Sequence, residues 1–165
     1  MIRSIIWTVI FCIAAIIVQS TLIGMIPFAK VKPDLALVIL VFSAYVNGTM
    51  TGQVSGFFSG LFQDFLSASP PGMNCLMRTL IGALTGIFKG AFFLDFFLMP
   101  LILCIIATFL KAFILFILHL IMGQVIPAIS FTTSPFWIEL GLNAFCGPLL
   151  FFLLKRFKPM LIERR

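Results

Sequence analysis

Charged residues are scarce in this sequence. Of its 165 residues, 10% are Asp, Glu, Lys or Arg, whereas 62% are hydrophobic. A soluble domain has roughly a quarter of its residues charged, which allows it to cover its surface with polar groups. Uncharged runs extend over residues 4–29, 35–63 and 112–138, and roughly 20 apolar residues in a helix cross the hydrocarbon of a bilayer. Because these runs lack the alternation of barrel strands, the sequence predicts an all-α membrane protein.

Catalytic and metal-binding motifs are also missing. The sequence contains no glycine-rich phosphate loop, no His-Glu-x-x-His motif and no nucleophile elbow, so it does not indicate an enzyme. Four cysteines lie in apolar stretches without Cys-x-x-Cys or Cys/His spacing, and we interpret them as small buried hydrophobic residues. They are Cys12, Cys75, Cys104 and Cys146. The sequence therefore predicts no disulfide, no metal site, no cofactor and no catalytic residues.

Six apolar segments are expected to form one transmembrane bundle over residues 1–165. The turn dipeptide Asn47-Gly48 divides one long uncharged run into two short helices. The first segment resembles a signal peptide, but it is too long for one and lacks a small-x-small cleavage site, so we expect it to be retained. Asp34 is placed to cap the second helix. The expected helices are about Ile5–Ile26, Asp34–Val46, Thr51–Leu66, Asn74–Phe88, Pro100–Met122 and Phe136–Leu154.

The net charge of +6 does not indicate nucleic-acid binding, because the positive residues lie mostly at the termini or near helix ends. Six crossings put both termini on one side of the membrane, and the side richer in Lys and Arg is expected to be cytoplasmic. The side of the termini carries Arg3, Lys89, Lys155, Arg156, Lys158, Arg164 and Arg165. The opposite side carries Lys30, Lys32 and Arg78. We therefore predict cytoplasmic termini.

Two stripes of glycine at a spacing of four residues follow the third and fourth expected helices. This spacing puts small residues on one helix face, where a second backbone can approach closely. The first stripe is Gly52, Gly56 and Gly60, and the second is Gly82, Gly86 and Gly90. Two interpretations are open: both stripes pack helices within this bundle, or one of them docks the membrane helix of a partner.

Ionisable residues at membrane depth are costly and are therefore functional candidates. Asp34, Asp64 and Arg78 are all expected toward the outer face. Asp64 ends the third helix and Arg78 is near the start of the fourth, so we predict that they form an ion pair that clamps this helical hairpin. The alternative is that each side chain reaches interfacial water separately.

Lys111 is expected near the middle of the fifth helix, too deep to reach the membrane surface easily. His119 lies on much the same helical face, and Glu139 begins the sixth helix at a depth similar to that of His119. These three residues could form a path for a proton or a substrate. More often such a set is a polar seam whose members satisfy one another.

One region also carries a recognisable order of motifs. Its elements are Pro33-Asp34-Leu35, the glycines of the third helix leading into Gln63-Asp64-Phe65-Leu66-Ser67, then Ser69-Pro70-Pro71-Gly72-Met73-Asn74, and finally Gly82 and Gly86. This order resembles the rod shape-determining protein MreD family. Chain length, six helices and a basic tail agree with the resemblance, whereas Ala68 stands where a glycine is common and Lys111 matches no motif of the family.

The resemblance implies a non-catalytic scaffold in the bacterial inner membrane, within the machinery for cell shape and peptidoglycan elongation. Such a protein would bind MreC, chiefly through that protein's membrane helix, and would link MreB filaments to cell-wall synthases; membrane lipid would surround it. The family is similar in fold to the substrate-binding subunits of energy-coupling-factor transporters, so a small-solute-binding subunit is the alternative. Those subunits carry an Ala-x-x-x-Ala stripe on their first helix. Here Val18 and Gln19 follow Ala14 and Ala15 by four residues, which favours the scaffold.

Overall fold

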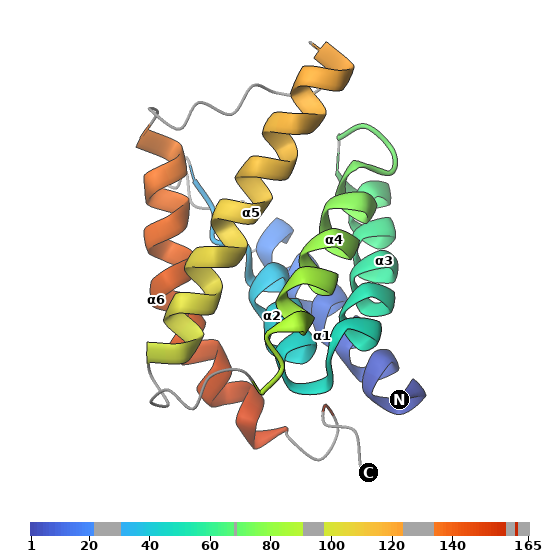
Figure 1. The fold of residues 1–165 in the computed structure, drawn as a ribbon, viewed down its shortest axis with the longest axis vertical. Helices are drawn as coiled ribbons and strands as arrows, with labels where there is room; N and C mark the ends of the chain where they lie inside the picture. The colour runs from blue at the N-terminus through green and yellow to red at the C-terminus, as the bar shows by residue number, and fades with distance from the viewer. Residues whose placement is uncertain (22–30, 68, 91–97, 124–133, 158–160, 162–165) are drawn as a thin grey trace.

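The computed structural model describes residues 1–21, 31–67, 69–90, 98–123, 134–157 and 161, and the regular secondary structure of these residues is entirely helical (Figure 1). The helices are α1 (Ile2–Thr21), α2 (Leu35–Asn47), α3 (Thr49–Leu66), α4 (Met73–Ile87), α5 (Leu98–Met122) and α6 (Ser134–Arg156). The all-α prediction is confirmed. The expected end of the first helix at Ile26, and most of the connections expected at residues 27–33, 89–99 and 123–135, lie outside the described residues.

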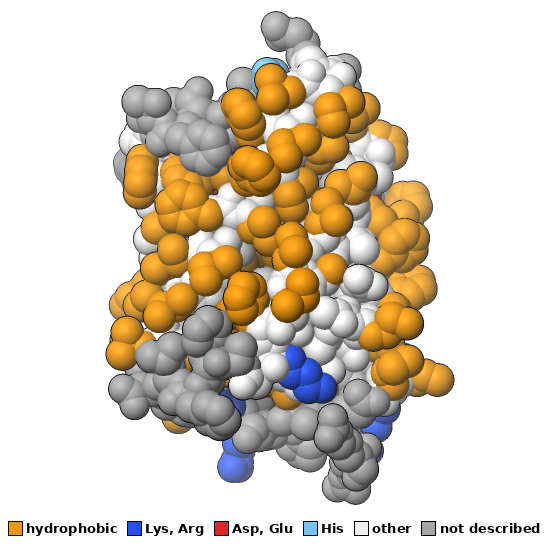
Figure 2. Space-filling model, viewed as in Figure 1, with side chains coloured by type: hydrophobic (Ala, Val, Ile, Leu, Met, Phe, Trp, Pro, Cys, Tyr) orange, Lys and Arg blue, Asp and Glu red, His pale blue; other side chains and the backbone are white. Residues whose placement is uncertain are grey.

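Three of the six helices, α1, α5 and α6, are long and apolar enough to cross a membrane. The helices α2 and α4 are apolar but shorter, with 13 and 15 residues. Large hydrophobic side chains also cover the outside of the bundle, and they dominate the face seen in Figure 2. A monomeric soluble protein rarely exposes apolar surface on this scale. The apolar helices and the apolar surface indicate a membrane protein.

The short helix α2 is the centre of the bundle, and it contacts all five other helices. Its residues from Ala36 to Ala44 are buried without interruption. A helix that is apolar on every side is buried in a protein core or lies in a membrane, and α2 has such a sequence, Leu-Ala-Leu-Val-Ile-Leu-Val-Phe. Gly48, at a φ of 104°, then turns the chain directly into α3, as the Asn47-Gly48 dipeptide predicts.

The glycine stripes of α3 and α4 face each other. A Cβ added at Gly52 would lie closer than 3.0 Å to the Gly82 carbonyl, and one added at Gly56 would lie equally close to the Arg78 carbonyl. Gly60 and Gly86 likewise touch the backbone of the opposite helix. Both stripes are therefore covered within the chain, and a partner helix could reach them only by displacing α3 or α4.

Gly90, the last member of the second stripe, does not belong to this contact. It lies beyond the end of α4 with a φ of 72°, and no atom stands near the position that its Cβ would occupy. The spacing therefore predicts the packing role of Gly82 and Gly86 but not that of Gly90, because the helix ends before it.

Leu161 lies beside the start of α1, and its side chain is fully buried. The Leu161 carbonyl accepts hydrogen bonds from the Ser4 hydroxyl and from the Asn47 side-chain amide, each at 2.8 Å. Phe157, just past α6, also stacks against Phe11 of α1 with ring centroids 5.4 Å apart. The N-terminus and the end of α6 consequently lie at the same end of the bundle (Figure 1).

Candidate functional site

Asp34 is the centre of an ion network in which Arg78 and Asp34 are buried and Lys111 and Glu139 are half-buried. It is the residue before α2, and its carboxylate Oδ1 accepts a hydrogen bond of 3.1 Å from the backbone N–H of Leu37, which caps the helix. The same oxygen lies 3.0 Å from Arg78 Nη2, and the other, Oδ2, lies 3.0 Å from Lys111 Nζ. Lys111 Nζ is also 2.5 Å from Glu139 Oε1. The order of the network is therefore Arg78–Asp34–Lys111–Glu139.

The four charges balance, with two acids and two bases in alternation. They come from α4, the start of α2, α5 and α6, so the network connects four parts of the bundle. An isolated buried ion costs several kcal/mol, and removing one partner of a buried pair typically costs about 3–5 kcal/mol. The alternation of sign is what makes these four residues tolerable inside an apolar bundle.

Two neutral side chains complete the surroundings of Asp34. Its backbone N–H donates to Asn143 Oδ1 on α6 at 2.8 Å, and Asn143 Nδ2 donates to Thr108 Oγ1 on α5 at 3.1 Å. Asn143 and Thr108 are both buried. Each end of the Asn143 amide therefore has a partner, and the start of α2 is attached to α6 through the backbone as well as through charge.

Arg78 is incompletely satisfied. Its side chain has no exposed surface, and its Nε and Nη1 groups have no hydrogen-bond acceptor in the structure. Ser55 Oγ, on α3, is another buried polar atom without a partner. Most buried donors in native proteins find an acceptor, so each exception calls for an explanation.

The predicted Asp64–Arg78 ion pair is wrong. Asp64 instead receives the free backbone N–H groups at the start of α4: Gly72 and Asn74 donate to it at 3.0 Å and Cys75 at 3.1 Å. A carboxylate is favoured at a helix N-terminus by this hydrogen bonding and by the helix dipole. Asp64 thus does link α3 to α4, as expected, but through the backbone of α4, while Arg78 extends to Asp34.

The Asp64 cap is enlarged by hydroxyl groups from the connection between the two helices. Asn74 Nδ2 donates to Asp64 Oδ1 at 2.9 Å and to Ser69 Oγ at 2.7 Å, and Ser67 and Ser69 bond each other through their hydroxyls. Asp64, Ser67, Ser69 and Asn74, all from the segment quoted above for its resemblance to a family, are therefore joined in one hydrogen-bonded cluster.

Of the expected Lys111, His119 and Glu139 set, the structure brings Lys111 and Glu139 into direct contact. This ion pair needs no histidine between its members, so a chain that passes from Lys111 through His119 to Glu139 is not what the geometry provides. The expectation missed the role of Asp34 as the other partner of Lys111, and it missed Asn143 and Thr108. Asn143 and Thr108 could have been suggested by the sequence, because each is a polar residue inside an apolar helix.

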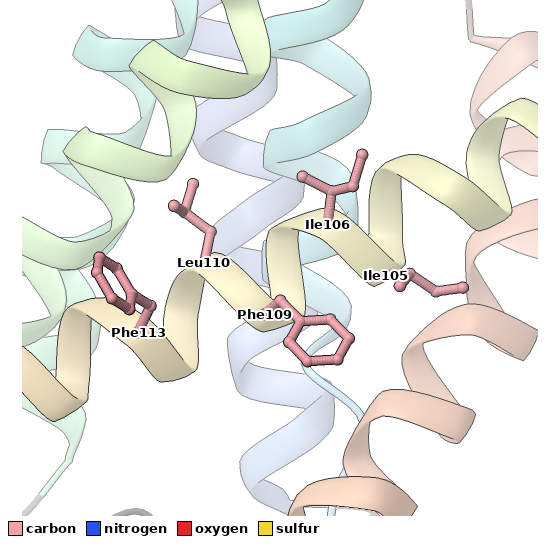
Figure 3. A pocket seen from close by; sticks show the side chains of 5 residues that line it. All are labelled: Ile105, Ile106, Phe109, Leu110 and Phe113. Carbon is pink, nitrogen blue, oxygen red and sulfur yellow. The ribbon is translucent and has the colours of Figure 1, made fainter. Parts of the chain in front are cut away.

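One surface recess offers nothing to a polar ligand. One recess of about 560 Å³ is formed by Ile105, Ile106, Phe109, Leu110 and Phe113, all from α5 (Figure 3). It is entirely apolar, as expected for a face in contact with lipid. In the part of the chain that the structure describes, no three His, Cys, Asp or Glu side chains gather as a metal site would require.

Comparison with known proteins gives a single kind of match. Neither a curated protein nor a solved structure matches the sequence. The family model described as rod shape-determining protein MreD matches residues 1–161. Because this match covers almost the whole chain, from the start of α1 to the buried Leu161, the protein belongs to the rod shape-determining protein MreD family.

Proposed function

We propose that this protein is a non-catalytic scaffold of the bacterial cell-shape machinery in the inner membrane. In this proposal it binds MreC, chiefly through the membrane helix of MreC, and links MreB filaments to the synthases that elongate peptidoglycan. The observation that carries the proposal is the family match over residues 1–161, because a family of shape-determining proteins implies a role in rod shape. The family is one of structural proteins rather than of known enzymes.

The interior of the bundle supports a structural role. Its charged side chains bond one another or a helix end. Arg78 and Lys111 pair with Asp34, and Asp64 accepts hydrogen bonds from the start of α4. A catalytic carboxylate or lysine needs access to a substrate, whereas Asp34 is buried and has bonds to both oxygens. We therefore assign Asp34, Asp64, Arg78 and Lys111 to holding the platform in shape.

In this proposal the glycines also hold the bundle in shape. Gly52, Gly56, Gly60, Gly82 and Gly86 join α3 to α4 so closely that the two helices act as one rigid unit. The partner's membrane helix would then dock on an outer apolar face of the bundle rather than on a glycine stripe. The exposed apolar side chains of α1, α5 and α6 provide such faces.

We further propose six membrane crossings with both termini in the cytoplasm. The N-terminus and the end of α6 lie at one end of the bundle, as an even number of crossings requires. Lys89 lies just past α4 and Arg156 is the last residue of α6, and both helices run toward that end, which agrees with the positive-inside rule. The short helices α2 and α4 would cross within the bundle, where neighbouring helices rather than lipid cover them.

A small-solute-binding subunit is the second candidate, and one observation favours it. A recess of about 140 Å³ lies between the C-terminal ends of α1 and α3, with Gln19, Lys32 and Gln63 among its lining residues. Gln63 Oε1 is buried and has no donor. At about 30 Å³ per water molecule the recess would hold about five waters, so a solute bound there would have to be very small.

Affinity purification in a mild detergent distinguishes the two candidates. The full chain with an affinity tag is expressed in a rod-shaped bacterium, and its partners are identified by mass spectrometry, with an unrelated polytopic membrane protein as the control. Recovery of MreC and cell-wall synthases is expected. Recovery of ATPase subunits of a transporter in their place would overturn the scaffold proposal.

A further inference from the structure

The ion network can be divided at one contact without leaving a charge alone. If Asp34 and Lys111 separate, Arg78 remains with Asp34, and Lys111 remains with Glu139. Breaking either end contact instead leaves a single ion without its partner, and this is most costly for Arg78, whose side chain has no exposed surface. The two neutral pairs also belong to different parts of the fold. Arg78 and Asp34 are on α4 and before α2, whereas Lys111 and Glu139 are on α5 and α6.

Arg78 is equipped to replace the contact that Asp34 would lose. At present Nη2 alone bonds Asp34, through Oδ1, while Nε and Nη1 have no acceptor in the structure. Arginine and carboxylate groups pair most strongly when two N–H groups meet two oxygens. If Lys111 leaves Oδ2, a second N–H of Arg78 can take its place. The same step gives an acceptor to a buried N–H group of Arg78 that otherwise has none.

The helices α5 and α6 form a hairpin with its own internal bonds. Lys111 and Thr108 of α5 bond Glu139 and Asn143 of α6, and Phe109 packs against Phe136 with ring centroids 5.4 Å apart. These contacts do not depend on α1–α4. A movement of the hairpin as one body would therefore preserve them.

The seam between α4 and α5 is loosely packed. The helix α5 crosses the bundle obliquely, and its first turns lie far from α4 (Figure 1). Where the C-terminal end of α5 approaches the start of α4, a recess of about 280 Å³ remains, with Met73 and Leu76 on one side and Leu118 and Met122 on the other. The α3–α4 contact, with its glycines in backbone contact, leaves no comparable space.

We propose that the α5–α6 hairpin moves as a unit relative to α1–α4, with the Asp34–Lys111 contact as the latch that holds the α4–α5 seam closed. The hydrogen bond from the Asp34 backbone to Asn143 is the pivot, since it is neutral and lies at the start of α2. Opening exchanges the four-membered network for two neutral pairs. It widens an apolar seam while every charge of the network keeps a partner of opposite sign.

Distance measurement between spin labels tests the latch in the full chain reconstituted in lipid nanodiscs. One label replaces Leu80 on α4, which is 42% exposed, and the other replaces Leu120 on α5, which is 68% exposed. A second protein with labels at Leu80 and Phe58 reports the α3–α4 distance as the matched control. Cys146 is replaced by Ser, because the other three cysteines are buried. The variants compared are K111R, K111Q and K111Q/E139Q.

The latch predicts a new α4–α5 distance in K111Q/E139Q, longer by roughly 5 Å, half a helix diameter. The double variant removes the hairpin's neutral pair as a whole, so its fold is retained, which the unchanged α3–α4 distance verifies. K111R keeps the contact with Asp34 and is expected to show the short distance of the unaltered chain. An α4–α5 distance in K111Q/E139Q that equals that of K111R, or an equal change in both label pairs, would overturn the proposal.

Discussion

Replacing Asp34 with Asn is the sharpest test of the ion network, because it removes charge and little else. The amide is nearly the same size as the carboxylate, and its oxygen can still accept from the backbone of Leu37, so the cap of α2 is retained. Lys111 keeps Glu139 as a partner. Arg78, however, has no exposed surface and no other counter-charge in the network, so it becomes an uncompensated buried ion.

Removing one partner of a buried pair typically costs about 3–5 kcal/mol, and we expect a loss of this size in D34N. The matched control is D64N, in which the altered residue caps a helix at a partly exposed site; losing a cap typically costs about 0.5–2 kcal/mol. The free energy of unfolding is measured in mixed micelles by titration with a denaturing detergent. Four proteins are compared: D34N, D64N, R78M and D34N/R78M.

The double variant identifies the origin of the loss. In D34N/R78M the unpaired cation is gone, and Lys111 and Glu139 remain as a neutral pair, so we expect the double variant to be more stable than D34N alone. If D34N cost no more than D64N, or if the cost of the double variant equalled the sum of the single changes, the view that Asp34 compensates Arg78 would be refuted.

Two further predictions concern packing and sidedness. G56L is expected to prevent the close approach of α3 and α4, because even a Cβ at Gly56 would lie closer than 3.0 Å to the Arg78 carbonyl. We expect the loss of stability to exceed the roughly 1–3 kcal/mol typical of overpacking. The measurement is the yield of folded protein that resists detergent. The control is G141L, since Gly141 is also helical and has no atom within 4 Å of its Cβ position, and equal yields of the two variants would contradict the packing role. Green fluorescent protein fused after Arg165 is expected to fluoresce, whereas alkaline phosphatase fused after Lys32 is expected to be active; an inverted result would place the termini outside.

The helices were predictable from sequence because their signals are local. Apolar runs set their number, and the Asn47-Gly48 turn and the Asp34 cap set two of their boundaries within a residue or so. Helix ends without a strong local signal were less well placed. The helix α5 begins at Leu98 rather than Pro100, because proline is tolerated anywhere in the first turn, where its missing N–H is not needed.

The partners of the charges could not be predicted in the same way. Asp64 and Arg78 are 14 positions apart across one turn, and proximity in sequence favoured pairing them. Asp34 and Arg78 are 44 positions apart, and Lys111 is 77 positions from Asp34. Which of several carboxylates an arginine reaches depends on how the helices pack in three dimensions. In this fold the glycine contact fixes α4 against α3. The Asp64 carboxylate accepts hydrogen bonds from the backbone of α4, and Arg78 pairs with Asp34 instead.

The contrast between the two hairpins indicates which part of this fold a bound partner would move. The α3–α4 hairpin is held by backbone contacts at five glycines and by the Asp64 cap, so a small change in outside forces cannot separate its helices. The α5–α6 hairpin is held to the centre in part by one ion contact and one neutral hydrogen bond, both made by Asp34. A partner that binds the outer face of α5 would therefore act on the weaker of the two connections. In the scaffold that we propose, a shift of this hairpin is the means by which binding at one face would alter the opposite face.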